Sequence, residues 1–142
     1  MRLVFGAFVI LVFQVFAVAA HAQSGLEGLW HTQGNRSIVR VAPCGEAYCG
    51  TIVSVAPKPD GSVWRDTHNP NPALQHRTME GVQILSGLRV RGAGWSGGKI
   101  YNPADGRTYD ARARLLANGS LQIDGCVAVF CRAQIWAQAQ AQ

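Results

Sequence analysis

The stretch from Gly94 to Leu115 carries the clearest pattern of apolar and polar positions in the chain. Its second half alternates strictly, with Tyr109, Ala111, Ala113 and Leu115 on one face and Thr108, Asp110, Arg112 and Arg114 on the other. This period of two is typical of a half-buried antiparallel strand, because successive side chains point to opposite sides. The intervening Asn102 to Gly106 has the proline, aspartate and glycine of a tight turn. The stretch therefore predicts a β-hairpin, and its small inner alanines indicate a curved wall or a cavity.

Shorter runs of the same kind predict further strands on both sides of this hairpin. They lie at 28–33, 37–42, 48–56, 120–124 and 132–137. The segment 81–90 is ambiguous, since it reads either as one strand or as two short strands broken at Gly87. The Ala-Gln repeat of 137–142 is expected to fray. With no long helix predicted, about eight or nine short antiparallel strands indicate an all-β fold, a small closed or nearly closed barrel that removes exposed sheet edges.

Residues 57–80 interrupt this pattern, since they hold Pro57, Pro59, Pro70 and Pro72 and show no sustained periodicity. A loop of this length in a small domain is usually functional or disordered. Residues 69–74 are predicted to lead into a single helical turn. We interpret the loop as a lid over the barrel.

The first 22 residues have the composition of an export signal. Arg2 precedes an almost unbroken apolar run to Ala20, and residues 20–22 (Ala-His-Ala) form a small-x-small cleavage site. A membrane anchor is the alternative, because about 18 apolar residues are just able to span a bilayer. The cleavage site and the polar Gln23 favour a signal peptide at 1–22, cleaved after Ala22, and a single mature domain at 23–142. No apolar segment of the mature chain is long enough to cross a membrane.

The charge distribution argues against a nucleic-acid partner. The formal net charge of +5 falls to +4 when Arg2 is removed with the signal, and the basic residues form no run. A protein that binds nucleic acid needs a basic stripe with interleaved aromatic residues. A solvated basic surface therefore explains the charge.

All four cysteines lie in the predicted mature part, at Cys44, Cys49, Cys126 and Cys131. An even number in an oxidising compartment predicts two disulfides. Pairing across the sequence is worth about 4–5 kcal/mol on the chain-entropy model, against about 2 kcal/mol for each short loop. Hairpin tips nevertheless bring opposite Cβ atoms to about 4 Å, so we predict the local pairs. A four-thiolate metal site is the alternative, but the spacing is not Cys-x2-Cys and export disfavours free thiols.

Characteristic blocks of sequence extend from Gly28 to Trp136. They include Cys44-Gly45, Cys49-Gly50, Asn69 to Leu74, Arg77, Gly81, Trp95 to Pro103, Asp105 to Tyr109, Gly125-Cys126 and Cys131-Arg132. Together they resemble the bacterial family called domain of unknown function 2147. The resemblance implies an exported envelope protein with a lipocalin-like (calycin) β-barrel and no established reaction. Gly28-Leu29-Trp30 is also similar to the Gly-x-Trp motif of lipocalins, which implies that Arg132 stacks on Trp30 to close the barrel base.

Five residues are candidate ligand contacts: Trp95, Tyr101, Tyr109, Asn69 and Arg77. The aromatic residues flank the central hairpin and combine an apolar ring with a polar atom, although ordinary barrel packing is the alternative. Asn69 is expected to bond to the loop backbone. Arg77 is expected either to pair with Asp66 or to meet an anionic head group. For Asp66, His68 and His76, a solvated loop is favoured over metal ligands or an acid–base pair, because no partner motif fixes their geometry.

The sequence contains no recognised catalytic motif. It lacks Gly-x-Ser-x-Gly, a helical His-Glu-x-x-His and a paired-carboxylate signature, so we predict no enzyme activity, no metal and no cofactor. The leading hypothesis is a periplasmic lipocalin-like protein that binds a small apolar or amphipathic molecule. The alternatives are an envelope structural or interaction module without a ligand, and an enzyme that acts through Asp66, His68 and Arg77. The sequence leaves the oligomeric state open.

Overall fold

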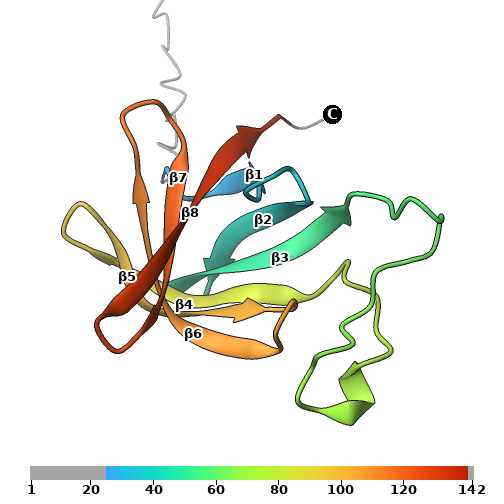
Figure 1. Cartoon of the computed structure of the whole chain (residues 1–142). Coiled ribbons are helices and arrows are strands. Elements are labelled where there is room, and N and C mark those ends of the chain that lie inside the picture. The colour runs from blue at the N-terminus through green and yellow to red at the C-terminus, as the bar shows by residue number, and fades with distance from the viewer. Residues whose placement is uncertain (1–24, 141–142) are drawn as a thin grey trace, which may run out of the picture.

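Within residues 25–140, eight strands follow one another around a closed antiparallel barrel (Figure 1). They are β1 (Gly28–His31), β2 (Ser37–Cys44), β3 (Ala47–Val55), β4 (Gln83–Arg91), β5 (Gly94–Asn102), β6 (Arg107–Leu115), β7 (Leu121–Val127) and β8 (Phe130–Ala139). Each strand pairs with its neighbours in sequence, and β8 closes the ring on β1. The predicted all-β antiparallel barrel is confirmed.

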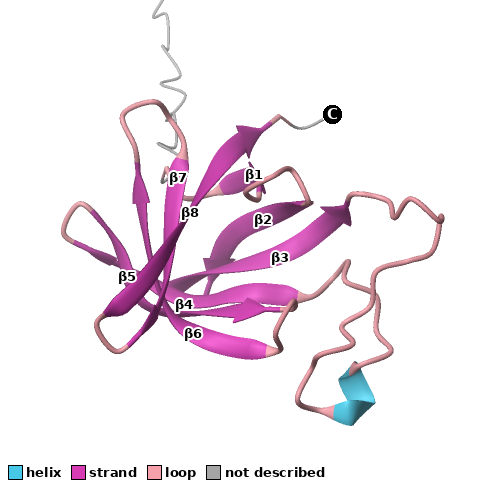
Figure 2. Ribbon diagram, in the orientation of Figure 1, coloured by secondary structure: helices cyan, strands magenta, loops and turns pink. Residues whose placement is uncertain are grey.

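The computed structural model describes residues 25–140. The predicted export signal at 1–22 therefore lies outside the described residues. Between residues 25 and 140, no helix has the length and apolar character needed to cross a membrane. Figure 2 shows strands throughout the barrel and one short 3-10 helix, η1 (Pro72–Leu74), in the long β3–β4 connection.

Two uncertain segments of the sequence have a definite structure. The ambiguous segment 81–90 contributes one strand, β4, in which Gly87 adopts a φ of +67°. This irregularity shifts the alternation, so that both Leu85 and Leu88 are fully buried. The expected fraying of the Ala-Gln repeat is wrong for residues 137–139, because they pair with β1 and close the barrel.

Burial along the inner wall divides the barrel into a packed half and an open half. Residues directly opposite one another on paired strands face the same side of the sheet, which places Leu121, Ile123 and Val127 of β7 on the inner wall. Leu121 and Ile123 are fully buried, whereas Val127 is 61% exposed. Trp30 and Trp136 are also buried, so large side chains fill the half of the barrel at which β8 ends.

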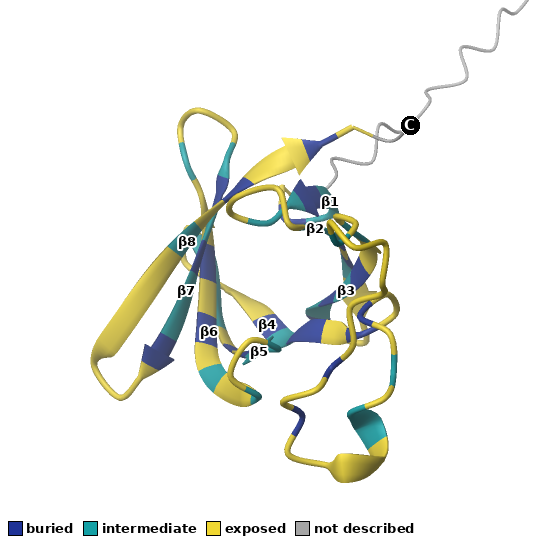
Figure 3. Ribbon diagram, turned by 45° about the vertical axis from the view of Figure 1, so that its right-hand side comes forward, coloured by how far each residue is buried: buried dark blue, intermediate teal, exposed yellow. Residues whose placement is uncertain are grey.

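The open half results from the unequal lengths of β1 and β8. Within β8, only residues 137–139 pair with β1, so the first half of β8 has a strand neighbour on one side alone. Beyond that pairing, the Gln33 side chain accepts a hydrogen bond from the Ile135 amide at 3.1 Å. The β7–β8 hairpin therefore extends past the ring, at the lower left of Figures 1 and 3, and its end is exposed.

Both predicted local disulfides are present. Cys44–Cys49 joins the strands at the β2–β3 turn, with the Cα atoms 5.8 Å apart. Cys126–Cys131 joins directly opposite residues of β7 and β8, with the Cα atoms 4.0 Å apart. Successive turns lie at alternate ends of the barrel, so these two disulfides cross-link turns at opposite ends.

The expected stacking of Arg132 on Trp30 is wrong. Trp30 lies opposite Gln138 on β8, and 138 − 132 = 6 residues separate that position from Arg132. At about 3.3 Å per residue the separation along the strand is roughly 20 Å. The Trp30 indole N–H instead donates to the Leu26 carbonyl at 3.0 Å.

Candidate ligand-binding site

A pocket of about 350 Å³ opens at the mouth of the barrel, between the ends of the β5–β6 and β7–β8 hairpins. Its lining residues are Ile100, Asn102, Asp105, Tyr109, Gly125, Val127, Phe130, Cys131, Arg132 and Gln134. Register accounts for most of this set, because Ile100 lies opposite Tyr109 and Gly125 lies opposite Arg132, which puts these side chains on the inner wall. The pocket is thus the unfilled part of the barrel interior.

Apolar side chains in this pocket remain exposed although they lie on the inner wall. Val127 is 61% exposed and Phe130 is 80% exposed. The wall that would cover them is missing, because β1 does not reach this part of β8. Together with Ile100 they form an apolar surface that a bound molecule would cover.

The polar side of the pocket contains one engaged acid and one unengaged cation. The Tyr109 hydroxyl donates to Asp105 Oδ2 at 2.5 Å, and the Arg107 amide donates to Asp105 Oδ1 at 2.9 Å. Burial acts to raise the pKa of Asp105, but these hydrogen bonds outweigh it and hold the pKa below its ordinary value. Arg132 makes no side-chain hydrogen bond or ion pair within residues 25–140, so its guanidinium is available to a ligand.

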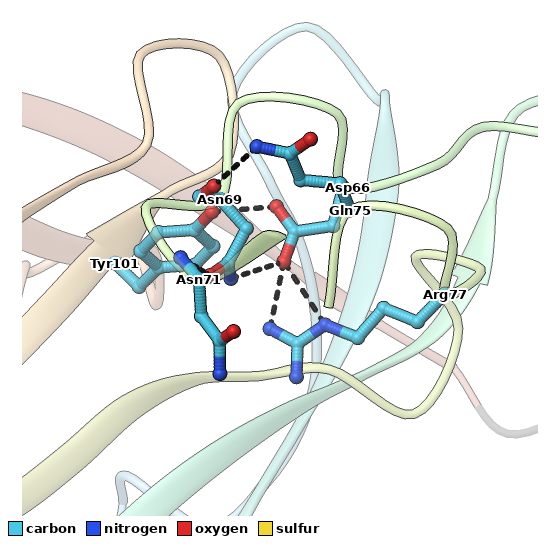
Figure 4. Close-up of polar contacts among 6 residues, drawn as sticks. All are labelled: Asp66, Asn69, Asn71, Gln75, Arg77 and Tyr101. Carbon is cyan, nitrogen blue, oxygen red and sulfur yellow. Dashed lines mark hydrogen bonds and ion pairs between the residues drawn. The ribbon is translucent and has the colours of Figure 1, made fainter. Parts of the chain in front are cut away.

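A second polar cluster surrounds Asp66 in the 57–80 loop (Figure 4). Asp66 is fully buried, and its Oδ2 accepts from Asn69 Nδ2 at 2.8 Å and from Arg77 Nε and Nη2 at 2.9 and 2.7 Å. Its Oδ1 accepts from the Tyr101 hydroxyl at 2.5 Å. The predicted Asp66–Arg77 pair is therefore confirmed. Four donors satisfy a carboxylate that would be very unfavourable if it were buried without partners.

The sequence around residues 69–77 builds this cluster locally. Asn69 Oδ1 accepts from the Asn71 amide at 2.9 Å, which confirms the expected bond between Asn69 and the loop backbone. Asn71 in turn caps η1, the predicted helical turn, by accepting from the Ala73 amide at 3.1 Å. Gln75 Nε2 donates to the Asn69 carbonyl at 2.9 Å. These bonds fix the direction in which Asn69 approaches Asp66.

The Asp66 cluster fastens the loop to the outside of the barrel. Tyr101 lies between Ile100 and Asn102, which line the pocket, so its side chain projects from the opposite face of β5. The β5–β6 turn makes a second contact, because a Cβ added at Gly106 would lie only 1.8 Å from the His68 carbonyl oxygen. The loop thus packs against β5 and its turn from outside, while the pocket lies on the inner side.

Titration of this cluster predicts two limits to loop docking. Burial acts to raise the pKa of Asp66, but hydrogen bonds from Tyr101, Asn69 and Arg77 lower it overall from the ordinary 3.8. Burial and the hydrogen bond to Asp66 raise the pKa of Tyr101 to about 12. Because the pKa of Asp66 is lowered, its carboxylate stabilises the docked loop above about pH 4, and this stabilisation is lost on acidification. Because the pKa of Tyr101 is raised, its phenol stabilises the docked loop below about pH 10, and this stabilisation is lost between pH 10 and about 12.

The alkaline limit is measurable from tyrosinate absorbance at 295 nm. When the absorbance of Tyr101→Phe is subtracted from that of the wild type at each pH, we expect the difference to follow a titration centred near pH 12. Circular dichroism at each pH would verify that the barrel remains folded. A Tyr101 titration centred near pH 10 would contradict the buried hydrogen bond.

The sequence places the chain in a described family. A family model described as "Uncharacterized protein conserved in bacteria (DUF2147)" matches residues 28–138. The chain belongs to this family. Among solved structures it is similar to protein HP1028 from Helicobacter pylori, described as belonging to the lipocalin family, with 30% sequence identity and a TM-score of 0.69. The likeness covers 81% of this chain and 83% of that chain, and it confirms the lipocalin-like fold. A comparison with curated proteins gives no match.

In this DUF2147 protein, the five candidate ligand contacts fall into three places. Tyr109 lines the pocket, whereas Asn69, Arg77 and Tyr101 meet at Asp66. Trp95 lies in neither, since it faces Ala113 across the β5–β6 pair, and its buried indole N–H has no hydrogen-bond partner in the described part of the chain. As ligand contacts, all five stay predictions. No residue of the 57–80 segment lines the pocket, so its role as a lid also stays a prediction.

Sequence reasoning missed most of the lining of the DUF2147 pocket. Ile100, Val127, Phe130, Arg132 and Gln134 were not among the candidates, although Arg132 and Gln134 share a face with Trp136 at a spacing of two. That alternation would have predicted that Arg132 and Gln134 face the barrel interior together with Trp136. His68 is exposed and takes no part in the Asp66 cluster, and residues 25–140 contain no group of three or more His, Cys, Asp or Glu arranged to hold a metal ion.

Proposed function

We propose that this DUF2147 protein is an exported, periplasmic binding protein that carries a small amphipathic molecule in the mouth of its barrel. The observation that carries the proposal is the pocket itself, whose inner-wall residues Val127 and Phe130 are 61% and 80% exposed. A lipocalin-like fold supports a binding role. Two disulfides support an oxidising compartment.

The pocket matches a ligand with an apolar body and one polar or anionic end. The apolar body lies against Ile100, Val127 and Phe130, where its contact removes exposed apolar surface from water. The polar end meets Arg132 and Gln134, of which Arg132 has no competing carboxylate partner within residues 25–140. A volume of about 350 Å³ lies near the lower end of the range of roughly 300–1,000 Å³ for ligand pockets, which indicates a small molecule.

Filling the pocket at Gly125 tests this function. Gly125 lies in β7 without a positive φ, and a Cβ added there would lie 3.3 Å from Ile100 Cγ2 and 3.6 Å from Tyr109 Cβ. The two further methyl groups of Gly125→Val would occupy the pocket, while valine suits a strand. In calorimetric titrations with dodecanoate as the probe, we expect the variant to bind at least about tenfold more weakly than the wild type, a loss of about 1.4 kcal/mol.

Ala133→Val provides the matched control, because Ala133 is exposed on β8 of the same hairpin and does not line the pocket. Its affinity for dodecanoate should equal that of the wild type. The uncharged 1-dodecanol should bind more weakly than dodecanoate, since it offers Arg132 no anion. The proposed site is wrong if Gly125→Val binds dodecanoate as tightly as the wild type does, or if the wild type binds neither probe.

A further inference from the structure

The turn between β7 and β8 has an unusual composition for its position. Two-residue hairpin turns favour glycine, asparagine and aspartate, which adopt a positive φ at little cost. The β2–β3 and β4–β5 turns each contain a glycine with a positive φ, at Gly45 and Gly92. Here the turn is Ala128-Val129, and Ala128 adopts a φ of +52°. The tip therefore has apolar residues at positions where glycine, asparagine or aspartate would adopt the turn conformation at lower cost.

The same tip exposes more apolar surface than its surroundings. Val129 is 85% exposed, Phe130 is 80% exposed and Val127 is 61% exposed. They belong to the end of the β7–β8 hairpin, which projects from the barrel far from the long loop in both views (Figures 1 and 3). Cys126–Cys131 lies directly behind the tip and joins its two strands. The tip is thus a short apolar projection on a cross-linked base.

Arg132 is the cation near the tip that has no ion-pair partner within residues 25–140, whereas the nearby Asp110 and Asp124 are paired with Lys99 and Arg112. Residues 125–140 contain no aspartate or glutamate, and Arg132 is their one charged side chain. Behind the disulfide, Arg112 Nη2 lies 3.4 Å from Cys131 Sγ, and Arg112 pairs with Asp124 at 3.0 Å. An apolar end with a cation at its base is complementary to a surface that is apolar inside and anionic outside.

We propose that the β7–β8 tip, residues 127–130, inserts into the interfacial region of an anionic lipid bilayer. A protein partner fits less well, because a stable interface buries about 800 Å² on each partner and this projection presents only four convex residues. A bilayer requires no complementary shape, and it accepts valine and phenylalanine while its headgroups attract Arg132. The tip also borders the pocket, since Val127 and Phe130 line it, so a docked barrel would open toward the lipid surface. The lipid contact rests on the tip alone and does not depend on the proposed ligand.

Flotation with lipid vesicles tests this proposal. The protein used is the chain from Gln23 onward, the predicted mature form, which holds all eight strands of the barrel. We expect it to float with vesicles of phosphatidylcholine and phosphatidylglycerol mixed at roughly 3:1, because the anionic phosphatidylglycerol attracts basic side chains. Val129→Ser should reduce the bound fraction at least about fivefold, because it replaces the most exposed apolar side chain of the tip with a polar one.

Val63→Ser is the matched control, since Val63 is also an exposed valine, 54% accessible, but lies on the 57–80 loop. It should float as the wild type does. Val129 does not line the mouth pocket, so Val129→Ser should keep its affinity for dodecanoate and thereby separate this proposal from the proposed function. The proposal is overturned if the wild type does not float, or if Val129→Ser and Val63→Ser float equally. It is also overturned if sedimentation without vesicles shows that the wild type is a dimer and Val129→Ser a monomer, because the tip would then be a contact between two copies.

Discussion

Replacing Asp66 by alanine is expected to release the 57–80 loop from the barrel while the eight strands stay closed. The substitution removes the acceptor of four hydrogen bonds, from Asn69, from Arg77 twice and from Tyr101. Hydrogen bonds to a charged group contribute about 1.5–3 kcal/mol each, but they do not add when they share one acceptor. Arg77, whose side chain is 36% exposed, also recovers part of its loss from water. We expect a net loss of about 3 kcal/mol in loop docking, or about a hundredfold more of the undocked loop.

Amide hydrogen exchange measures this release residue by residue. The amides of Asp66, Arg77 and Met79, which bond within the loop, should exchange faster in the variant. The amides of β5 and β6 should keep their protection, because the strand pairing does not involve the loop. Asp60→Ala is the control, since Asp60 lies in the same loop but bonds only to Ser62 at an exposed position. Unchanged exchange at Arg77 in Asp66→Ala would show that other contacts hold the loop.

The fold was largely predictable because its information is local. Strict alternation from Thr108 to Leu115 identified β6, and the turn residues at 102–106 located its hairpin with β5. The cysteine spacing likewise predicted each disulfide, since hairpin tips juxtapose nearby residues. Each of these features depends on residues that are close in sequence, so alternation and spacing along the chain are enough to predict it.

The site was less predictable because it depends on register. A bulge in β5 lets Trp95 face Ala113 while Gly98 faces Ala111, so three residues of β5 span two of β6. That shift, which alternation alone does not show, places Tyr101 outside the pocket. The partnership of Tyr101 with Asp66 joins residues 35 positions apart and satisfies a buried charge, which is a tertiary requirement.

The two polar clusters therefore have separate roles on the two faces of one hairpin. Tyr109, on the inner face, shares the pocket with Arg132, whereas Tyr101, on the outer face, holds the loop through Asp66. The β5–β6 turn links them, because Asp105 lines the pocket and the adjacent Gly106 packs against His68. The β5–β6 turn is therefore shared by the pocket and the docked loop.

Replacing Trp136 by alanine is expected to produce the largest loss of global stability. Trp136 is 1% exposed on the inner wall and lies opposite Leu121, which is fully buried. Removing a buried tryptophan side chain costs about 3–5 kcal/mol, because apolar contact is lost and a cavity remains.

Thermal unfolding should show a Tm lower by roughly 10–20 °C for a domain of this size. The neighbouring Ile135→Ala serves as the control, since Ile135 is 42% exposed and its loss should cost about 0.5–1 kcal/mol at most. Equal Tm values for the two variants would mean that this half of the barrel is not the packed core that supports the open half. A selective loss in Trp136→Ala would mean that stability resides at one end of the barrel, which allows Val127 and Phe130 at the other end to remain exposed.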